Sequence, residues 1–343
     1  MNLATAKINE QFLDKLGVDI ISVEPLQGGA NSQVAKVISG QKDTFFVKTY
    51  RQTIGDTRDR LGTEFEGLRF LWNHDIRSIP EPLFADRENN FAVYRFVQGQ
   101  MLNSIDITTK HLSEIVAFFS ALRDLIYAQE DAKKISKASE ACFSLSDYLI
   151  NIEQRLVRLS EVKHKQFQDF INTCLFPIWK VLKQDVLRTS AKLGFSIDHL
   201  LPLDERTLSP SDVGFHNILC EVPSKRLIFI DFEYFGWDDP VKMICDFILQ
   251  PAMPLPIKLY PIFLKEIQQS FPFRDKLVNR FELLFPILGI KWCLIILNPF
   301  LPERIQKLGV DGDLILEQRL AKAQEKLSTV YHYHQTREFL QWV

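Results

Sequence analysis

The sequence lacks the marks of several large classes of protein. No run of lysine and arginine occurs in its 343 residues, and the formal net charge is only −2. This balance argues against a protein that grips nucleic acid through phosphate contacts. The first 16 residues, MNLATAKINEQFLDKL, carry charges and contain no apolar stretch. We therefore expect no signal peptide and a cytoplasmic protein.

Cysteine is scarce, and long uninterrupted apolar runs are missing. The five cysteines are odd in number and scattered along the chain, which predicts buried free thiols of a reducing compartment rather than a disulfide framework. The most apolar stretch, residues 285–301, is interrupted by Lys291, Asn298 and Pro299. The sequence therefore predicts a buried helix here and no membrane span.

The residues that are present fit a globular protein with two different parts. Apolar residues make up 46% and charged residues 24% of the chain, as in ordinary soluble domains. Strand-like runs predominate before residue 98, whereas apolar residues recur at helical spacing from residue 103 to about 200 and again from residue 255. His332 and His334 form only a weak metal pattern, because no acidic partner is evident beside them.

The most informative stretch is residues 208–240, LSPSDVGFHNILCEVPSKRLIFIDFEYFGWDDP. Asp231 ends an apolar, β-branched run that predicts a buried strand, and Asp212 and Asn217 precede it on a loop. Phosphoryl transfer needs one carboxylate beside the accepting hydroxyl, and a second carboxylate with an amide oxygen to hold magnesium on the phosphates. Each residue alone is an ordinary turn or strand-end residue. Together they predict a phosphotransfer site.

This segment resembles the catalytic core of the aminoglycoside phosphotransferase and choline kinase family, the small-molecule branch of the protein-kinase-like fold. The family pattern is His-Gly-Asp, four residues, Asn, and a strand that ends in Ile-Asp-Phe-Glu or Ile-Asp-Trp-Glu. Residues 230–234, Ile-Asp-Phe-Glu-Tyr, are especially similar to the choline and ethanolamine kinases. The resemblance implies a catalytic base at Asp212 and Mg²⁺ ligands at Asn217 and Asp231. Glu233 is expected to assist through water or a second metal.

The sequence departs from this pattern beneath the loop. Pro210 stands where the family usually has His, and Ser211 where Gly is common. Because proline fixes φ and lacks an N–H, the loop must be held by other contacts. Met243 stands where an acidic residue is common, and Asp246, three residues further on, is a candidate to replace it.

A glycine hairpin lies near the N-terminus. Two strand-like runs flank Gly28, Gly29, Asn31 and Ser32. Glycine lets a backbone approach phosphates closely, and Asn31 and Ser32 add side-chain donors. The alternative is an ordinary hairpin turn, for which Gly-Gly is a common sequence.

A lysine interrupts the next predicted strand, residues 44–50. Lys48 is either an edge-strand lysine or the lysine that binds the α- and β-phosphates and pairs with a helix glutamate. Two glutamates on the following predicted helix compete for that pairing. We expect Glu64 rather than Glu66, because Glu64 shares a helix face with the apolar leucines.

The strand over residues 91–97 resembles the hinge strand of the family, whose main chain binds the adenine edge. The resemblance implies that the cofactor ATP contacts main-chain groups of Arg95, Phe96 and Val97. The side chain of Arg95 is assigned no chemistry.

These expectations combine into one fold. We predict an α+β, two-lobed protein-kinase-like protein. The small lobe, residues 1–97, is an antiparallel sheet with one helix, and the larger, mainly helical lobe, residues 98–343, carries the catalytic loop and the metal site.

The expected activity is an ATP- and Mg²⁺-dependent phosphotransfer to a hydroxyl of a small molecule, such as an amino sugar, a sugar, a choline-like amine or an amino alcohol. Tyr234 and Trp237, which follow the metal strand, are packing residues or walls of a pocket for a quaternary amine. The sequence leaves the oligomeric state open. Pro210 motivates an alternative, a nucleotide-binding pseudokinase or scaffold. A protein kinase is disfavoured, because Glu233 replaces the glycine of Asp-Phe-Gly and no Ala-Pro-Glu segment follows.

Overall fold

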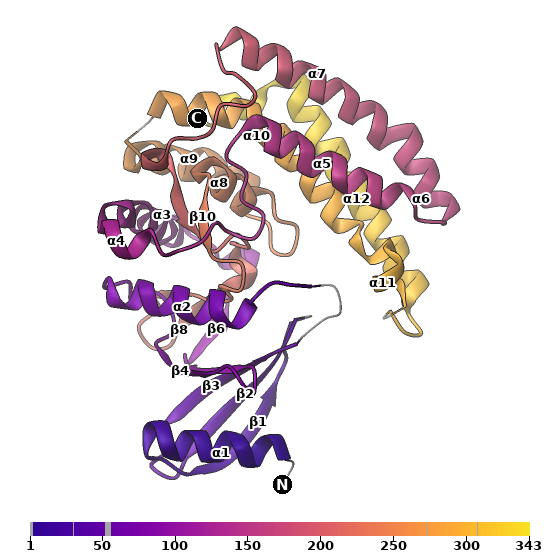
Figure 1. Ribbon diagram of the computed structural model, residues 1–343. Coiled ribbons are helices and arrows are strands. Elements are labelled where there is room, and N and C mark those ends of the chain that lie inside the picture. Colours follow the sequence, from indigo (N-terminus) through magenta and orange to yellow (C-terminus); the bar gives the residue numbers. More distant parts are fainter. Residues whose placement is uncertain (1–2, 30, 52–55, 273, 307) are drawn as a thin grey trace.

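The computed structural model describes residues 3–29, 31–51, 56–272, 274–306 and 308–343. It forms a small sheet-containing lobe and a larger helical lobe (Figure 1). The predicted α+β, two-lobed fold is confirmed. The large sheet ends at Arg95, and the next strand, Gly99–Met101, pairs with a strand of the helical lobe.

The small lobe is built on a five-stranded antiparallel sheet of order β1-β2-β3-β5-β4. Burial rises from the edge to the centre of this sheet: the edge strand Ile20–Leu26 has no buried residue, whereas the first four residues of Phe91–Arg95 are all buried. The bounds of the five strands are β1 Ile20–Leu26, β2 Ser32–Ser39, β3 Thr44–Tyr50, β4 Pro82–Asp86 and β5 Phe91–Arg95.

Two helices, not the predicted one, belong to the small lobe. α1, Leu3–Leu16, covers the outer face of the sheet (Figure 1). Its Phe12 packs edge to face against Phe45 at 5.2 Å and Phe84 at 5.6 Å between ring centroids. The sequence prediction missed α1 because polar and charged residues separate its few apolar ones; among residues 10–16, Phe12 is fully buried and Leu16 packs partly against the same core.

α2, Arg60–Asn73, lies on the side of the sheet that meets the helical lobe. It begins at the N-cap Asp59, whose side chain accepts a hydrogen bond from Gly62 N at 2.8 Å. Gly67 then lets the helix touch the other lobe, because a Cβ there would lie 2.5 Å from Phe235 Cδ1. No larger residue fits at this contact.

The helical lobe has a long central helix. α10, Arg274–Ile296, packs against α8, Pro240–Leu249, and α12, Gly312–Thr336. Every residue of α8 is buried. The other α-helices are α3 Thr109–Asp124, α4 Gln129–Ala132, α5 Leu145–Ser160, α6 Lys165–Phe170, α7 Phe176–Lys192, α9 Tyr260–Ser270 and α11 Pro302–Ile305.

One helix of the described chain, residues 275–300, is long and apolar enough to cross a membrane. Its most apolar window has a mean hydropathy of 1.8, but 83% of that window is buried inside the protein. Lys291 within it is buried and pairs with Asp246. These are the properties of a core helix, as the sequence predicted.

Two short sheets lie under the catalytic segment. β6, Gly99–Met101, pairs with β8, Ile218–Glu221, which pairs with β9, Leu227–Phe229. β7, Thr207–Ser209, pairs with β10, Gly236–Asp238. The loop between β7 and β8 carries Asp212 and Asn217, and Asp231 follows β9.

All five cysteines are free, as predicted, but not all are buried. Cys142, Cys245 and Cys293 are buried, whereas Cys220 is partly exposed and Cys174 is exposed. The prediction was wrong for Cys174 because its apolar neighbours Ile171 and Leu175 occupy the inner face of this turn while the thiol points outward. The five-residue π-helical turn here, Ile171–Leu175, shifts the helical period that the prediction assumed.

Candidate active site

A buried lysine joins the two lobes. Lys48 on β3 donates hydrogen bonds to Glu64 Oε2 of α2 and to Asp231 Oδ1 beyond β9, each at 2.6 Å. Burial opposes the charge on the ammonium, but the two carboxylates more than offset it and raise the pKa of Lys48. The lysine is therefore a fixed cation. Glu66 does not compete for it, because its carboxylate pairs with the exposed Arg69.

Two tyrosines orient the glutamate. The Tyr50 hydroxyl donates a hydrogen bond to Glu64 Oε2 at 3.0 Å. The same hydroxyl oxygen lies 3.0 Å from the hydroxyl oxygen of Tyr94. Burial raises the pKa of both phenols well above the usual value, so they stay neutral donors. Both carboxylate and lysine are thus held in one geometry before any ligand arrives.

The loop between β7 and β8 brings Asp212 and Asn217 to the strand that ends at Asp231. Asn217 Nδ2 donates to the carbonyl oxygen of Asp212 at 2.8 Å. The backbone carbonyl oxygen of Asn217 accepts a hydrogen bond from the backbone N–H of Ile230 at 3.0 Å. These two bonds place the loop directly beside the residue that precedes Asp231, as the sequence spacing predicted.

The sequence prediction missed a histidine in this loop. His216 Nε2 lies 3.3 Å from Asp212 Oδ1. His216 Nδ1 is buried, with no hydrogen-bond partner in the described chain. Gly214 makes room for the ring, because a Cβ there would lie 2.8 Å from His216 Nδ1. The i, i+4 spacing of aspartate and histidine was the only signal in the sequence.

Two non-glycine residues of the site have left-handed backbone. Ser211 and Asp231 both have φ of 67°, a region that costs a residue with a Cβ about 1 kcal/mol or more. Ser211 stands where glycine is common in the family pattern, which explains that preference. Strain of this kind persists where the surrounding contacts fix the backbone.

A buried ion cluster supports the loop in place of the missing histidine. Lys242 on α8 pairs with Asp238 at 2.5 Å and Asp246 at 3.3 Å. Its Nζ also lies 3.4 Å from Ser211 Oγ. Asp246 accepts hydrogen bonds from Lys291 Nζ and Trp292 Nε1. Asp246 is therefore buried and paired beneath the loop, while Met243 is an apolar residue of α8.

Glu233 connects the glycine hairpin to the segment after the metal strand. Its Oε1 accepts a hydrogen bond from Asn31 Nδ2 at 2.6 Å, and its Oε2 lies 3.5 Å from Arg60 Nε. Asn31 also donates to the Tyr234 hydroxyl at 2.9 Å. Both carboxylate oxygens of Glu233 thus face protein partners here, so a metal or water role requires that these contacts open.

The remaining hairpin residues lie apart from this contact. Gly28, Gly29 and Ser32 line a cavity of about 540 Å³. Most of the strand residues that line this cavity lie on the same face of the sheet as Val47. Lys48 points to the opposite face. Gly28 is required sterically, because a Cβ would lie 2.8 Å from the carbonyl oxygen of Ser32. Within the described chain, the hairpin side chain that reaches the Asp231 segment is that of Asn31.

In the predicted hinge segment, residues 95–97, one backbone N–H is hydrogen-bonded within the sheet and another has no backbone partner among the described residues. Phe96 N donates to Thr44 O at 3.2 Å, whereas the N–H of Val97 has no backbone partner among the described residues. The ring of Phe96 lies 5.5 Å below Lys36 Nζ. The side chain of Arg95 turns away to Glu81 at 3.3 Å and stacks over Phe45, on the outer face.

The oxygen atoms near Asp231 fit a magnesium ion. Asp231 uses one carboxylate oxygen for Lys48, and the amide oxygen of Asn217 is left over when its nitrogen bonds Asp212. Across the described residues, no group of three or more His, Cys, Asp or Glu side chains could hold a metal. One carboxylate and one amide suit Mg²⁺, which takes further ligands from phosphates and water, and do not suit a structural zinc site.

The sequence matches a known family along about two thirds of its length. The sequence model of the phosphotransferase enzyme family matches residues 22–247, a range that includes Lys48, Asp212 and Asp231. A search of curated proteins by sequence finds no match.

Solved structures share the fold at low sequence identity. The choline kinase LicA of Streptococcus pneumoniae is 16% identical, with 96% of this chain and 100% of that chain covered and a TM-score of 0.59. The spectinomycin phosphotransferase APH(9)-Ia, solved with ADP and spectinomycin, is 14% identical, with 94% and 98% covered and a TM-score of 0.63. An ethanolamine kinase of Plasmodium vivax is 14% identical, with 92% and 84% covered and a TM-score of 0.56.

Proposed function

Because the chain belongs to the phosphotransferase enzyme family, we propose that it transfers the γ-phosphoryl group of ATP to a hydroxyl of a small molecule. The observation that carries this proposal is the bond of Lys48 to both Glu64 and Asp231. It joins a phosphate-binding cation to a metal-binding carboxylate across the two lobes. The relatives solved with ADP or ATP support a nucleotide as donor.

Each residue has one role in the proposed reaction. Lys48 binds the α- and β-phosphates, and Asn31 with the glycine hairpin closes over them. Asp212 orients the acceptor hydroxyl for in-line attack and takes its proton as the oxygen–phosphorus bond forms. The backbone of residues 95–97 binds the adenine edge. Glu64 keeps Lys48 charged and in position.

Asp231 and Asn217 would hold Mg²⁺. The ion would neutralise charge on the phosphate oxygens and fix their orientation, which is most of what phosphoryl transfer requires. The left-handed backbone of Asp231 turns its carboxylate back toward Lys48. Glu233 is then a support for the hairpin, through Asn31 and Arg60.

The acceptor is a small hydroxyl compound that meets Asp212. The relatives are named for choline, ethanolamine and spectinomycin, all of which carry hydroxyls. An aromatic cage of Tyr234 and Trp237 for a quaternary amine has little support. Tyr234 lies 5.3 and 5.7 Å from the guanidinium carbons of Arg58 and Arg60, and Trp237 donates its indole N–H to Ala132 O.

A screen of small alcohols for magnesium-dependent ADP release tests the proposal. Amino sugars, sugars, choline-like amines and amino alcohols are the panel, and Asp212→Asn is the matched inactive variant. We expect at least one acceptor to stimulate ADP release in the native protein by more than 100-fold over the variant. Nucleotide binding without stimulation by any acceptor would support instead the pseudokinase alternative that Pro210 suggests.

A further inference from the structure

A contact at the end of the small-lobe sheet joins the two lobes a second time. Asn31, directly before β2, donates hydrogen bonds from its side-chain nitrogen to Glu233 Oε1 at 2.6 Å and to the Tyr234 hydroxyl at 2.9 Å. An amide nitrogen carries two hydrogens, so these bonds use both of them. The two bonds together form the Asn31 contact.

Both sides of the Asn31 contact are anchored in their own lobe. The carbonyl oxygen of Asn31 accepts a hydrogen bond from the N–H of Arg51 at 2.8 Å, which fixes it beside the end of β3. The carbonyl oxygen of Tyr234 accepts one from the N–H of Ser139 at 3.1 Å, within the helical lobe. The side-chain bonds therefore connect two fixed points, and movement of the lobes apart at this end must break them.

A second element of the small lobe meets the ring of Tyr234. Arg58 and Arg60, before and at the start of α2, have guanidinium carbons 5.3 and 5.7 Å from the ring centroid. Asp56 holds the guanidinium of Arg60 at 2.7 Å. Cations over an aromatic face are attracted to it. The sheet and α2 thus meet the same tyrosine, one at its hydroxyl and the other at its ring.

The hydroxyl of Tyr234 remains protonated. Burial and the neighbouring Glu233 carboxylate raise its pKa to about 12. A neutral phenol accepts the N–H of Asn31 and keeps its own hydrogen for Glu233. Phenylalanine at this position would lose these bonds and keep the ring for the arginines.

The Asn31 contact lies farther along the sheet than the lysine. Val34 is the cross-strand partner of Lys48, and Asn31 precedes Val34 by three residues, which is about 10 Å along a strand. Lys48 bonds Asp231, two residues before Glu233. The phosphates of a nucleotide held by Lys48 would thus lie between two closed junctions of the lobes.

We propose that Tyr234 gates the nucleotide site. Its hydroxyl and the Glu233 carboxylate hold Asn31 and keep the lobes closed, so a nucleotide enters or leaves only while the Asn31 contact is open. This inference rests on the proposed nucleotide binding and adds a residue that controls its rate. Closure of this kind keeps water from the phosphates and in many enzymes makes product release the slow step.

A gate and a ligand contact have different kinetic signatures. The Asn31 contact is made within the protein, both before and after the nucleotide binds. Weakening it raises the fraction of open molecules by the same factor in the free and in the bound state. The association and dissociation rate constants should therefore rise together, with an unchanged dissociation constant. Loss of a residue that touches the nucleotide would raise the dissociation rate constant alone.

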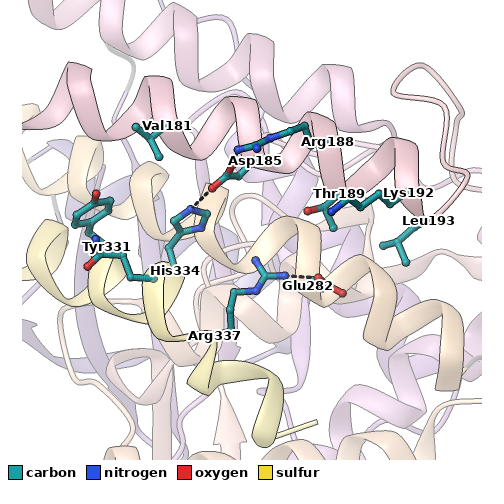
Figure 2. A pocket seen from close by; sticks show the side chains of 11 residues that line it. Val181, Asp185, Arg188, Thr189, Lys192, Leu193, Glu282, Tyr331, His334 and Arg337 are labelled. Atoms are coloured by element: carbon teal, nitrogen blue, oxygen red, sulfur yellow. Dashed lines mark hydrogen bonds and ion pairs between the residues drawn. The ribbon is translucent and has the colours of Figure 1, made fainter.

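Stopped-flow fluorescence with N-methylanthraniloyl-ADP and Mg²⁺ as the probe measures both rate constants. Tyr234→Phe should raise each of them about fivefold, which is the typical effect of one hydrogen bond, and should leave the dissociation constant within about twofold. Tyr331→Phe is the matched control. Tyr331 lines an open groove between α7 and α12 (Figure 2), and no residue of the Asn31 contact lines that groove. Loss of its hydroxyl should change neither rate constant.

A second variant tests whether Tyr234 acts through Asn31. Asn31→Ala removes the donor of both bonds and should raise both rate constants by more than Tyr234→Phe does. In the Asn31→Ala protein, the further change Tyr234→Phe should have no effect, because the bond that it breaks is already absent. A contact of Asn31 with the phosphates does not affect this comparison, since both proteins lack the side chain.

Three results would overturn the gate. One is that Tyr234→Phe leaves both rate constants unchanged. Another is faster dissociation with unchanged association, which would make Tyr234 a ligand contact. The third is an equal effect of Tyr234→Phe with and without the side chain of Asn31. A native protein that does not bind the probe would refute the proposed nucleotide site and the gate with it, whereas each of the three results refutes the gate alone.

Discussion

Asp231 accepts a hydrogen bond of 2.6 Å from Lys48, a residue 183 positions earlier in the other lobe. The same ammonium bonds Glu64, so one cation holds two carboxylates. A bound nucleotide must exchange part of this contact for bonds to phosphate and metal. The lobes are thus preorganised around the point where the phosphates are expected.

Glu64→Gln should lower both the stability of the protein and its affinity for nucleotide. The change removes a buried carboxylate from a buried lysine, which typically costs about 3–5 kcal/mol of unfolding free energy. Affinity for ADP should fall about tenfold, because Lys48 loses its support. Urea denaturation and calorimetric titration measure both effects. Glu66→Gln, two residues along the same helix, removes only exposed ion pairs, one with Arg69 and one with Arg87 at 4.0 Å, and should change stability by less than about 0.5 kcal/mol. Equal effects of both changes would contradict the assigned pairing.

His216→Ala should slow turnover without weakening nucleotide binding. His216 Nε2 lies 3.3 Å from Asp212 Oδ1, and we assign it the positioning of that carboxylate. Misplacement of a reacting group by about 1 Å costs up to about 100-fold in rate. The rate constant should fall by about 10- to 100-fold with the acceptor found in the screen, while KM for ATP stays within about twofold.

His216→Gln is the companion to that variant. Glutamine retains a side-chain N–H that reaches Asp212, so it should recover part of the rate. If alanine and glutamine lower the rate equally and both lower the melting temperature, the histidine is a packing residue and the positioning role is wrong.

Two substitutions at Ser211 isolate the backbone of the catalytic loop. Both Ser211→Gly and Ser211→Ala remove the hydroxyl that lies 3.4 Å from Lys242 Nζ. Only glycine adopts φ of 67° without a Cβ penalty. The glycine variant should therefore be more stable than the alanine variant by about 1 kcal/mol, as measured by urea denaturation. A more stable alanine variant would show that the loop does not keep this conformation in solution.

The partly buried Lys326 should make stability depend on pH in the alkaline range. Burial lowers its pKa from 10.5 to about 8, and Lys322 acts in the same direction while Cys293 opposes it. The unfolded chain then binds more protons between pH 8 and 10.5, so this group adds stability as pH rises through that window and loses it as pH falls through 8. A difference of this size corresponds to about 3 kcal/mol.

Lys326→Met isolates this contribution, because other groups also titrate there. Burial raises the pKa of Cys142 and Cys293 to about 12, which acts in the opposite direction in both proteins. The native protein should therefore gain stability relative to the variant between pH 7.5 and pH 10. Thermal unfolding across that range measures the difference. A difference that stays constant with pH would refute the lowered pKa.

The sequence was sufficient where chemistry follows local spacing. Asp212, Asn217 and Asp231 are 5 and 14 residues apart, and one short hairpin, β8 and β9, brings them together. Lys48 and Glu64 are close in sequence as well, and helix periodicity alone favours Glu64 over Glu66. The α+β, two-lobed fold follows from strand patterns before residue 98 and helical ones after it.

Local sequence patterns could not predict contacts between segments that are distant in the chain. The bond of Asn31 to Glu233 spans 202 residues, and that of His334 to Asp185 spans 149. Neither partner carries a local signal for the other, because helix and strand periods report only which face is buried. His334 therefore seemed to lack an acidic neighbour, and Glu233 seemed free to serve a metal.

The contact of Gly67 with Phe235 limits how this enzyme can move. Since even a methyl group cannot fit between them, α2 rests directly on the segment that follows Asp231. We expect the small lobe to pivot at this contact, and the hairpin to move away only when the bonds of Asn31 to Glu233 and Tyr234 open. Residues near the pivot, Glu64 among them, would then stay almost still while the nucleotide enters and leaves.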